Sequence, residues 1–526
     1  MHILSLCLQH FLVLLKGAAL TAILLCVFFA AHRLFFSPIS HHPGPIVGKL
    51  SPLWAVYHAW RGDLAHTLWR LHEVHGDVVH YSPNLLSLNT LPALSALYSN
   101  TANVRKSTWY IPFAVSPKFA STHTTINRAE HRRKRTFLAR GFSPASMKVL
   151  TGRIVGCVET WTAALLPAPR TAFDSGGGIE LADGWGQTRD MADWAGYLTV
   201  SAMGELVFSA DFGLCTSDKN RWLPRATPLA ARSKYATCFM PVLRTLGLER
   251  WLWPDLLSVR QRLKAFSDAQ LRERYEKVSR EGKGEKQRDL FRCVMEATDD
   301  VTGETLRPEE LESEANLLIA AGGDTTSAAL AGTLFFLLHN CDCLERVTAE
   351  LRDRFQSLDS IVPGAELDDC VYLRACIDES MRLAPPVPSP LLREALAGGV
   401  HIGEHFFPEG TDLCVTTLAI MRKAEYYPDP LNYKPERWLE DVSKEAKAVF
   451  CPFSIGPRAC IGKKVAYMET LTALGRVLWG WDMRLAPGWE DYGKDEHGLY
   501  KLVDGFQTVK EGPMVQFRIR RGPGLP

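Results

Sequence analysis

A long uncharged stretch near the N-terminus restricts what the first part of this chain can fold into. Every residue from Gly17 to Ala31 is apolar or small. With its flank from Leu12, the stretch reaches about 20 residues, enough for a helix to cross the roughly 30 Å of a bilayer core. We therefore expect residues 1–36 to form a single-pass membrane anchor.

Two alternatives to a membrane anchor remain for this stretch, a cleaved signal peptide and a buried core helix. Ala30 and Ala31 lie near a position where a signal peptidase could cleave, so the segment can also be a signal peptide that is removed. A helix in the core of a soluble protein can be equally apolar. The residues before the stretch lack the positive charge that signal peptides carry, which favours a retained anchor.

The rest of the chain has the composition of a globular protein. Of the 526 residues, 46% are hydrophobic and 22% are charged, and the formal net charge is +2. This balance allows a large core and gives no reason to expect nucleic-acid binding. The 13 cysteines are thinly spread and form no CxxC pair, so a reducing compartment is favoured over a disulfide scaffold.

Proline and glycine separate the anchor from the globular part. His41–Pro45 predicts a stiff, non-helical connector within residues 37–50. We expect residues 51–526 to form a single catalytic domain. Within it, the segment from Pro167 to Gly178 is rich in proline and glycine and is expected to be a surface loop.

The spacing of apolar residues predicts that helices dominate this domain. Leu311–His339 has helical spacing, with glutamates in and before its first turns, where the helix dipole favours anions. Arg374–Leu383 is expected to be a second helix, because two prolines follow it closely. Short β-prone runs follow at Val400–Phe407 and Leu413–Leu418. The predicted fold class is mostly α with a small β region.

The segment Phe453–Gly462 near the C-terminus carries residues that suit a haem site. The thiolate of Cys460 can be the axial ligand of haem iron, where it donates electron density that favours O–O cleavage. Gly456 and Gly462 allow backbone N–H groups to approach the sulfur and stabilise it. The guanidinium of Arg458 suits a haem propionate, and Phe453 can lie against the ligand as an apolar lid.

A lone cysteine is more often an ordinary core residue, and Cys460 is one of 13. However, the chain matches the whole pattern FxxGxRxCxG around this cysteine. A chance match is on the order of one in several thousand for this composition. The pattern therefore favours Cys460 as the iron ligand.

Three more motifs precede this segment: Ala321–Thr326 (AGGDTT), Glu379–Arg382 (ESMR) and Pro435–Trp438 (PERW). Together and in this order, the four motifs resemble those of the cytochrome P-450 family, the haem-thiolate monooxygenases. The resemblance extends over nearly the whole chain after the anchor. Cys376–Leu383 and Gln507–Gly512 are similar to fungal members that act in secondary metabolism.

The resemblance to microsomal members of this family implies a fold, a cofactor and partners. Haem b (iron protoporphyrin IX) would lie between the long oxygen-side helix and the cysteine loop. The enzyme would insert one atom of O2 into a lipophilic terpenoid, polyketide or alkaloid. The chain has no GxGxxG nucleotide loop, so NADPH electrons are expected to arrive through an NADPH-cytochrome reductase. We expect the protein to reside in the endoplasmic reticulum membrane, with its catalytic domain in the cytosol.

The motif Ala321–Thr326 is expected to serve oxygen activation. Its two glycines, which cost a helix about 1 kcal/mol each, are expected to leave room for dioxygen. The hydroxyl of Thr325 can hold an oxygen species and a water, and Asp324 can relay protons to them. Alternatively, Thr325 only hydrogen-bonds to its own helix. The nearby Cys460 motif favours catalytic roles for Asp324 and Thr325.

Glu379 and Arg382 are three residues apart and share one helix face. Taken alone, they could be a surface pair that contributes almost nothing to stability. The resemblance implies instead a buried network with Arg437, whose role is structural because it holds the geometry of the haem-bearing core.

The resemblance also implies which residues bind the haem propionates. His131 and Arg135 are four residues apart and match the family's pattern, with His131 where many members have tryptophan. Arg393 stands at the family's third propionate-binding position. The alternative for this basic run is a solvated helix face. Its remaining residues, Arg132–Lys134, together with Lys463 and Lys464, are expected to face an acidic redox partner.

The family resemblance does not identify the substrate. It implies a pocket built from Arg105–Thr125, Phe208–Leu246, Ile319–Ala328, Pro386–Leu391 and Asp504–Thr508, which are largely apolar stretches. A haem-thiolate isomerase or dehydratase that consumes no O2 remains a rival, although Asp324 and Thr325 argue against it. A non-catalytic haem sensor is a second rival, and it would not need a proton relay.

Overall fold

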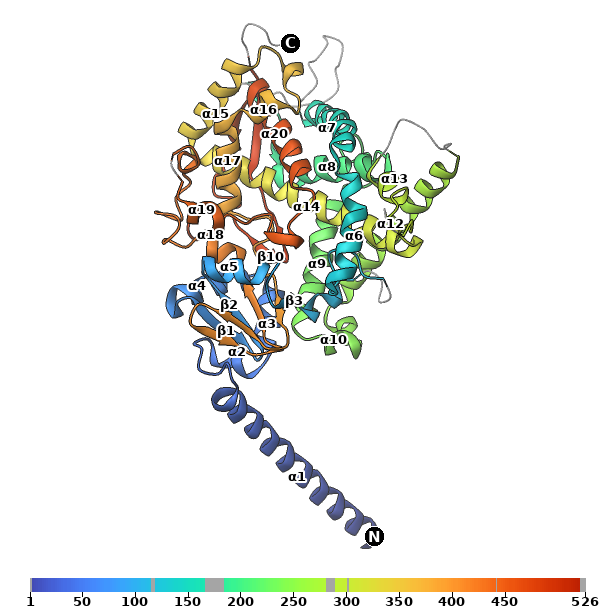
Figure 1. Ribbon diagram of the computed structural model, residues 1–526, viewed down its shortest axis with the longest axis vertical. Coiled ribbons are helices and arrows are strands. Elements are labelled where there is room, and N and C mark those ends of the chain that lie inside the picture. Colours follow the sequence, from blue (N-terminus) through green and yellow to red (C-terminus); the bar gives the residue numbers. More distant parts are fainter. Residues whose placement is uncertain are drawn as a thin grey trace.

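The computed structural model describes residues 2–114, 119–165, 184–280, 289–299, 302–440 and 442–520. The anchor segment forms a long helix, α1 (His2–Ala31), which continues as a short π-helix, η1 (His32–Phe36). This helix projects away from the rest of the molecule (Figure 1). Residues His10–Phe36 are long and apolar enough to cross a membrane, and their most apolar window is not buried against the protein. The expected Pro167–Gly178 loop lies outside the described residues.

The connector after the anchor is non-helical from His41 to Pro45, as the prolines and the glycine predict. Helix α2 (Ile46–Leu50) follows the prolines directly. The backbone N–H of His80 donates to the carbonyl oxygen of Pro43 at 2.7 Å. A Cβ atom on Gly44 would overlap the carbonyl of His80. The connector is therefore packed against the first strand of the large sheet, and its glycine permits this close approach.

Helices make up most of the described chain, as the sequence predicts. After α2 they are α3 (Leu53–Arg61), α4 (Leu64–His75), α5 (Leu91–Tyr98), η2 (Thr108–Phe113), α6 (Arg128–Gly141), α7 (Pro144–Leu165), α8 (Met191–Met203), η3 (Gly204–Phe208), α9 (Leu223–Phe239), α10 (Val242–Thr245), α11 (Glu249–Leu252), α12 (Pro254–Arg280), α13 (Leu290–Met295), α14 (Pro308–His339), α15 (Cys341–Arg354), η4 (Leu358–Ser360), α16 (Ala365–Asp368), α17 (Val371–Leu383), α18 (Thr417–Met421), η5 (Pro435–Trp438), α19 (Lys444–Val449), η6 (Gly456–Arg458) and α20 (Lys463–Gly480).

The strands form one larger sheet and three small ones. The five-stranded sheet has the order β1-β2-β8-β5-β3, and all its neighbours are antiparallel except β2 and β8. The other sheets are β4-β12-β9, β10-β11 and β6-β7. The strands are β1 (Val78–Ser82), β2 (Leu85–Leu88), β3 (Val104–Lys106), β4 (Arg189–Asp190), β5 (Arg393–Ala395), β6 (Val400–Ile402), β7 (His405–Phe407), β8 (Asp412–Val415), β9 (Trp481–Leu485), β10 (Val503–Gly505), β11 (Gln507–Val509) and β12 (Met514–Ile519).

The run Leu413–Leu418, expected to be β-structure throughout, changes type within its length. It belongs to β8 as far as Val415, and α18 begins at Thr417. A short run of apolar residues is compatible with either structure, so the sequence pattern could not place this boundary.

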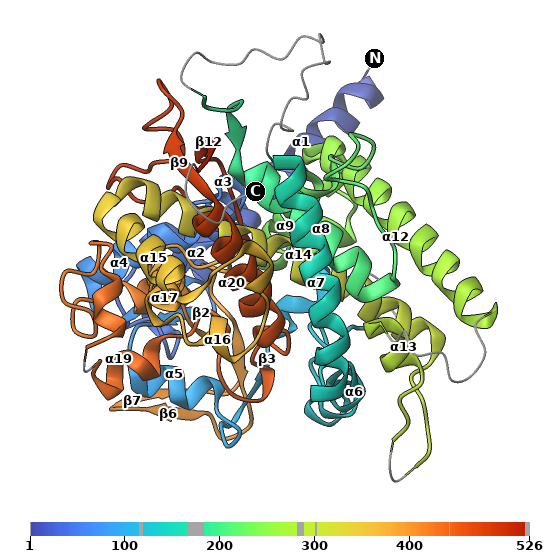
Figure 2. The ribbon, with the colours of Figure 1, turned by 90° about the horizontal axis from the view of Figure 1, so that it is seen from above.

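Helix α14 lies in the middle of the helical region, between α8 on one side and α17 and α20 on the other (Figure 2). It begins at Pro308, and the side chain of Glu310 accepts the backbone N–H of Arg307 at 3.1 Å, which caps the N-terminus. Every residue from Thr326 to Leu338 is buried, so this half of the helix is surrounded by protein.

Candidate active site

Cys460 lies in a loop between the short helix η6 and the N-terminus of α20. Its backbone N–H donates to the carbonyl of Phe453 at 2.8 Å, which closes the loop. Burial raises the pKa of the Cys460 thiol, whereas the N–H groups of Gly462 and Lys463 and the charges of Arg135 and Lys463 lower it. Burial is the larger effect and the pKa is raised, and the N-terminus of α20 opposes this rise in the direction that an axial thiolate requires.

Gly456 adopts a φ of 72° in this loop, a backbone conformation that suits glycine. A Cβ atom there would overlap the carbonyl oxygen of Tyr98 at the end of α5. The close approach at Gly456 therefore joins the loop to α5, whereas the N–H groups that affect the sulfur are those of Gly462 and Lys463. At Gly462, a Cβ would lie 3.9 Å from the sulfur of Cys460, an ordinary contact distance.

A group of cations from four distant parts of the chain meets beside this loop. Arg458 donates to the backbone carbonyls of Thr125 and Ile126 at 2.6 and 3.0 Å. Burial, together with Arg393, Arg128 and Arg135, lowers the pKa of Arg458 to about 10. The members that surround one another here are Lys106 on β3, His131 and Arg135 on α6, Arg393 on β5, and Arg458.

This cation group has no carboxylate partner among the described residues. Burial, together with Arg458 and Arg135, lowers the pKa of His131 to about 3, so its ring is neutral near pH 7 and the charges of the group are those of its lysine and arginines. Buried charges of one sign normally have a partner of the opposite sign. The two propionates of a haem next to Cys460 would supply such a partner, so the residues present fit this cofactor. Lys106 belongs to the group but was missed in the sequence, because it lies outside every motif.

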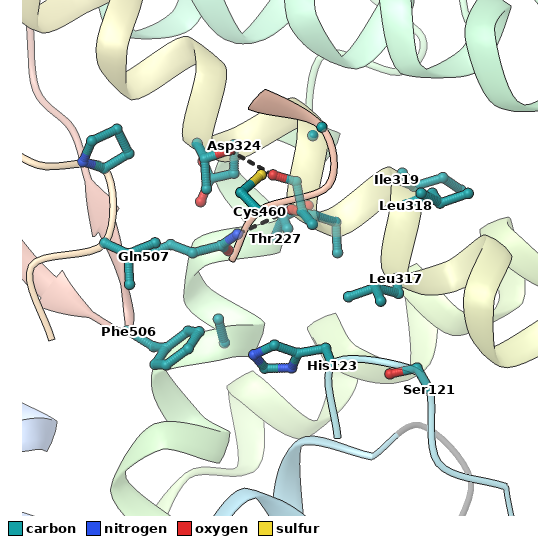
Figure 3. Close-up of a pocket in the computed structure, with 18 of the residues that line it drawn as sticks. Ser121, His123, Thr227, Leu317, Leu318, Ile319, Asp324, Cys460, Phe506 and Gln507 are labelled. Atoms are coloured by element: carbon teal, nitrogen blue, oxygen red, sulfur yellow. Dashed lines mark hydrogen bonds between the residues drawn. The ribbon is translucent and has the colours of Figure 1, made fainter. Parts of the chain in front are cut away.

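The expected oxygen-side residues lie on α14 and line the same cavity as Cys460 (Figure 3). The Thr325 hydroxyl donates to the carbonyl of Ala321 at 2.6 Å, the bond to its own helix that the alternative describes. One oxygen of Asp324 pairs with the ammonium of Lys510 at 2.7 Å. The two side chains are only 2% and 5% exposed, and the other oxygen of Asp324 has no hydrogen-bond partner in the described part of the chain.

The two glycines of α14 serve helix packing, and they do not leave an open space for dioxygen. A Cβ on Gly322 would overlap the sulfur of Met203, and one on Gly323 would lie 3.0 Å from Val200, both on α8. The hydroxyl of Thr199 on α8 donates to the carbonyl of Gly323 at 2.6 Å. The expectation was wrong because α8 already occupies the volume that the missing side chains leave.

Glu379, Arg382 and Arg437 meet in one buried network. Arg382 is paired with Glu379 at 2.8 Å, and Arg437 with the same carboxylate at 2.9 Å. The indole N–H of Trp438 donates to the second Glu379 oxygen at 3.0 Å. Arg382 also donates to three backbone carbonyls, those of Met421, Pro430 and Asn432. The network joins α17 to η5 and to the segment before it.

Two of the basic residues that were expected to face a redox partner do not. Arg133 pairs with Glu310 at 2.5 Å and with Glu130 at 2.9 Å. Lys134 is buried and lies 3.5 Å from Glu310. These residues hold α6 against the start of α14, whereas Lys463 and Lys464 are exposed.

One cavity of about 630 Å³ contains this site. All five stretches expected from the sequence contribute to its wall, although Phe208 itself does not. Several further parts of the wall were missed, among them α12 from Leu257 to Ser267, the α8 residues Val200 and Met203, and the α17 residues Ile377 and Met381. In Figure 3, Phe506, His123 and Gln507 lie across the cavity from Leu317–Ile319, with Cys460 and Asp324 nearby.

Comparison with known proteins decides the family. A family model described as Cytochrome P450 matches residues 93–504. The cytochrome P450 monooxygenase poxM of Penicillium oxalicum is 34% identical over 508 residues, which cover 96% of this chain and 95% of that protein. The chain belongs to the cytochrome P450 family. This P450 is also 35% identical to the cytochrome P450 monooxygenase atnE of Emericella nidulans, with 94% of each chain covered.

Membership confirms several expectations. The P450 is an oxidoreductase of the monooxygenase type with haem b as cofactor, and its electrons arrive indirectly through a reductase. Its mostly helical fold with small sheets is that of the family. A more distant relative is the averantin hydroxylase of Dothistroma septosporum, 30% identical over 93% of this chain and 88% of that protein. These relatives place the P450 among fungal enzymes of secondary metabolism.

Proposed function

We propose that this P450 inserts one oxygen atom into a lipophilic secondary-metabolite skeleton, such as a terpenoid, a polyketide or an alkaloid. The observation that carries the proposal is the single cavity in which Cys460 and the Asp324–Thr325 pair face largely apolar walls. Relatives named monooxygenase or hydroxylase support oxygen insertion over an isomerase, a dehydratase or a haem sensor.

In this proposal, Cys460 ligates the iron, Phe453 lies beside it, and the cation group holds the propionates. The bound haem supplies the activation of O2 and the transfer of one oxygen atom to the substrate. The protein contributes the thiolate, the charge balance and the exclusion of water by the apolar walls.

Asp324 and Thr325 supply protons in this scheme. The Thr325 hydroxyl donates a hydrogen bond to the Ala321 carbonyl, so its oxygen can still accept a hydrogen bond from a water in the cavity. Burial raises the pKa of Asp324, and the adjacent ammonium of Lys510 opposes this rise. Asp324 can therefore pass a proton between Lys510, which is bound to one of its oxygens, and a water at Thr325.

The N-terminal helix and an exposed apolar patch support a place on the endoplasmic reticulum membrane. The patch consists of large hydrophobic residues on and around α10 and α11, among which Trp251 is 87% exposed. In the view of Figure 1, α10 lies toward the end of the molecule from which α1 projects. We place the catalytic domain in the cytosol, where an NADPH-cytochrome reductase can approach the exposed Lys463 and Lys464.

The thiolate assignment can be tested by spectroscopy on the full chain. The reduced, carbon-monoxide-bound protein should show the spectrum of a thiolate-ligated haem, and Cys460→Ala should abolish it. Cys451→Ala is a matched control, since Cys451 is buried in the wall of the same cavity. Retention of the thiolate spectrum in Cys460→Ala would refute the assignment.

The reaction class is tested with the wild-type protein, reductase and NADPH. We expect oxygen consumption and products that contain one oxygen atom from O2. Rearranged or dehydrated products formed without O2 would instead support the isomerase or dehydratase.

A further inference from the structure

A second group of cations lines the same cavity, formed by other elements than those around Cys460. Its members are Lys234 on α9, Arg244 on α10 and Arg260 on α12. In Figure 1, these three helices lie below or to the right of α14. The group lies beside η2, because Lys234 and Arg244 both donate to backbone carbonyls at its end.

The charges of this group are not balanced within the protein. Arg260 pairs with Glu249 on α11 at 3.1 Å, and these side chains are 16% and 14% exposed. Lys234 donates to the carbonyl of Phe113 at 3.4 Å and Arg244 to that of Pro112 at 2.6 Å. A carbonyl accepts a hydrogen bond but does not neutralise a charge. Glu249 also attracts Lys234 and Arg244, so three cations of the cavity wall share this one carboxylate among the described residues.

The environment of Lys234 shows that these charges repel one another. Burial lowers the pKa of Lys234 to about 8, with further contributions from Arg260 and Arg244. Burial also lowers the pKa of Arg244, again with a contribution from Arg260. An anion bound between them would remove this repulsion and be attracted by both groups, in a partly water-excluded site.

The haem propionates do not account for this second group. The pKa of Lys106 is lowered by burial and by Arg393 and Arg458, but not by Lys234. The pKa of Lys234 is lowered by its own arginine neighbours. The pKa of His123 is lowered by burial and by cations of both groups, namely Lys106, Arg458, Arg393 and Lys234. The cavity thus has two basic regions on different elements: Lys106 lies over the ring of Tyr110 within η2, whereas Lys234 and Arg244 bind carbonyls at the end of η2.

We infer that the η2 end of the cavity binds the carboxylate of the substrate, so that the substrate is a lipophilic carboxylic acid. This assignment rests on the proposed function, and it narrows the substrate class. A carboxylate has one charge on two oxygens, which suits one ammonium group and one guanidinium whose donors are already partly used. The apolar walls between the two basic regions would hold the hydrocarbon part.

Such binding would orient the substrate. The carboxylate is held at one end of the cavity, whereas Thr325 and Cys460 line another part of it. The carbon presented for oxidation would then be distant from the carboxyl group along the skeleton, and its position would depend on the length of the acid.

Equilibrium binding to the purified full-length holoenzyme tests the assignment. The probes are straight-chain acids from octanoic to hexadecanoic acid, each compared with its methyl ester by titration calorimetry. We expect at least one acid to bind more tightly than its ester. Lys234→Met should weaken binding of that acid by roughly 10- to 150-fold, as expected for loss of a charged hydrogen bond, and should leave the ester within about twofold.

Matched variants separate the charge from the fold. Lys234→Arg should keep the preference for the acid, and Arg244→Met should reduce it as Lys234→Met does. Lys148→Met removes an exposed lysine on α7, outside the cavity, and should change neither affinity. Unchanged ester binding in each variant shows that the cavity is intact.

The assignment is overturned if no acid binds more tightly than its ester, or if Lys234→Met and Arg244→Met leave the acid's affinity unchanged. Tighter binding of dodecyl phosphate than of every acid would also overturn it, because the site would then be a phosphate site. None of these results affects the thiolate spectrum or NADPH-driven oxidation, which test the proposed function separately.

Discussion

At the scale of single residues, the hydroxyl of Thr325 has two possible roles that a substitution can separate. This hydroxyl donates a hydrogen bond to the carbonyl of Ala321, and Thr325 lines the cavity together with Asp324. If it positions a water for proton delivery, Thr325→Ala should consume NADPH but release more hydrogen peroxide and less product. Loss of proton delivery is typically worth about 10²- to 10⁴-fold, which bounds the loss of product.

The measurement is the amount of product formed per NADPH consumed. Thr325→Ser keeps the hydroxyl and should keep most of this ratio, while Asp324→Asn should slow turnover itself. The same ratio in Thr325→Ala and the wild type would show that Thr325 only packs α14.

The lowered pKa of Lys234 predicts how carboxylate binding depends on pH. A lysine attracts a carboxylate only while protonated, and burial lowers the pKa of this one to about 8. Affinity for the acid should therefore fall as the pH rises above about 8, whereas affinity for the ester should stay constant. Lys234→Arg should abolish this fall, since arginine stays charged. The charged and titratable groups that face Lys234 are Arg244, Arg260, Glu249, Cys238 and His123.

At the scale of elements, the Glu379 network joins α17 to η5. Both Glu379 and Arg382 are completely buried, so Arg382→Ala would leave the buried Glu379 carboxylate without one of its two arginine partners. Loss of one partner of such a pair costs about 3–5 kcal/mol, a large part of a typical stability margin. We expect little haem-loaded protein from Arg382→Ala, measured as haem per protein after purification. A stable, haem-replete and inactive variant would instead indicate a direct role in catalysis.

Glu314 ties α14 to the chain segment that precedes α6. One of its oxygens accepts the N–H and the hydroxyl of Thr122 at 2.6 and 2.8 Å. Burial raises the pKa of Glu314 to about 7. Because this exceeds the value in the unfolded chain, the folded protein binds the proton more tightly, and stability should fall as the pH rises from about 4.5 to about 7.

Glu314→Gln should remove this part of the pH dependence. Relative to the variant, the wild type should lose up to about 3 kcal/mol of stability between these pH values, from the linkage of one pKa unit to about 1.4 kcal/mol. Thermal unfolding at a series of pH values measures the difference. Glu309→Gln, at an exposed position in the first turn of the same helix, is the control. Parallel curves for the wild type and Glu314→Gln would contradict the prediction.

At the scale of the whole molecule, the anchor and the connector have different roles. Deletion of residues 1–36 removes a helix that projects from the molecule, so the remainder should still bind haem and become soluble or peripherally bound. Deletion as far as Leu50 should also lower the melting temperature, because the connector packs on β1. Membrane flotation and haem content measure both effects. Protection of the catalytic domain from protease inside intact microsomes would contradict the cytosolic orientation.

The sequence by itself determined the features that depend on short, local patterns. Apolar spacing and terminal glutamates were sufficient for α14, because a helix is stabilised by residues three and four apart. An unbroken apolar run predicted α1, and the residues around Cys460 predicted the loop before α20. Glu379 and Arg382 could be placed on one helix face from their spacing alone, since they are three residues apart.

Only the tertiary structure decided which distant residues meet. Lys510 reaches Asp324 across 186 positions of the chain, and no periodicity relates them. The volume beside Gly322 and Gly323 is filled by α8, which local sequence could not reveal. Lys234, Arg244 and Arg260 form one basic region because three helices converge on a single cavity. Charge balance in a protein depends on proximity in space, so sites of this kind follow from the packing of the elements and not from any local pattern.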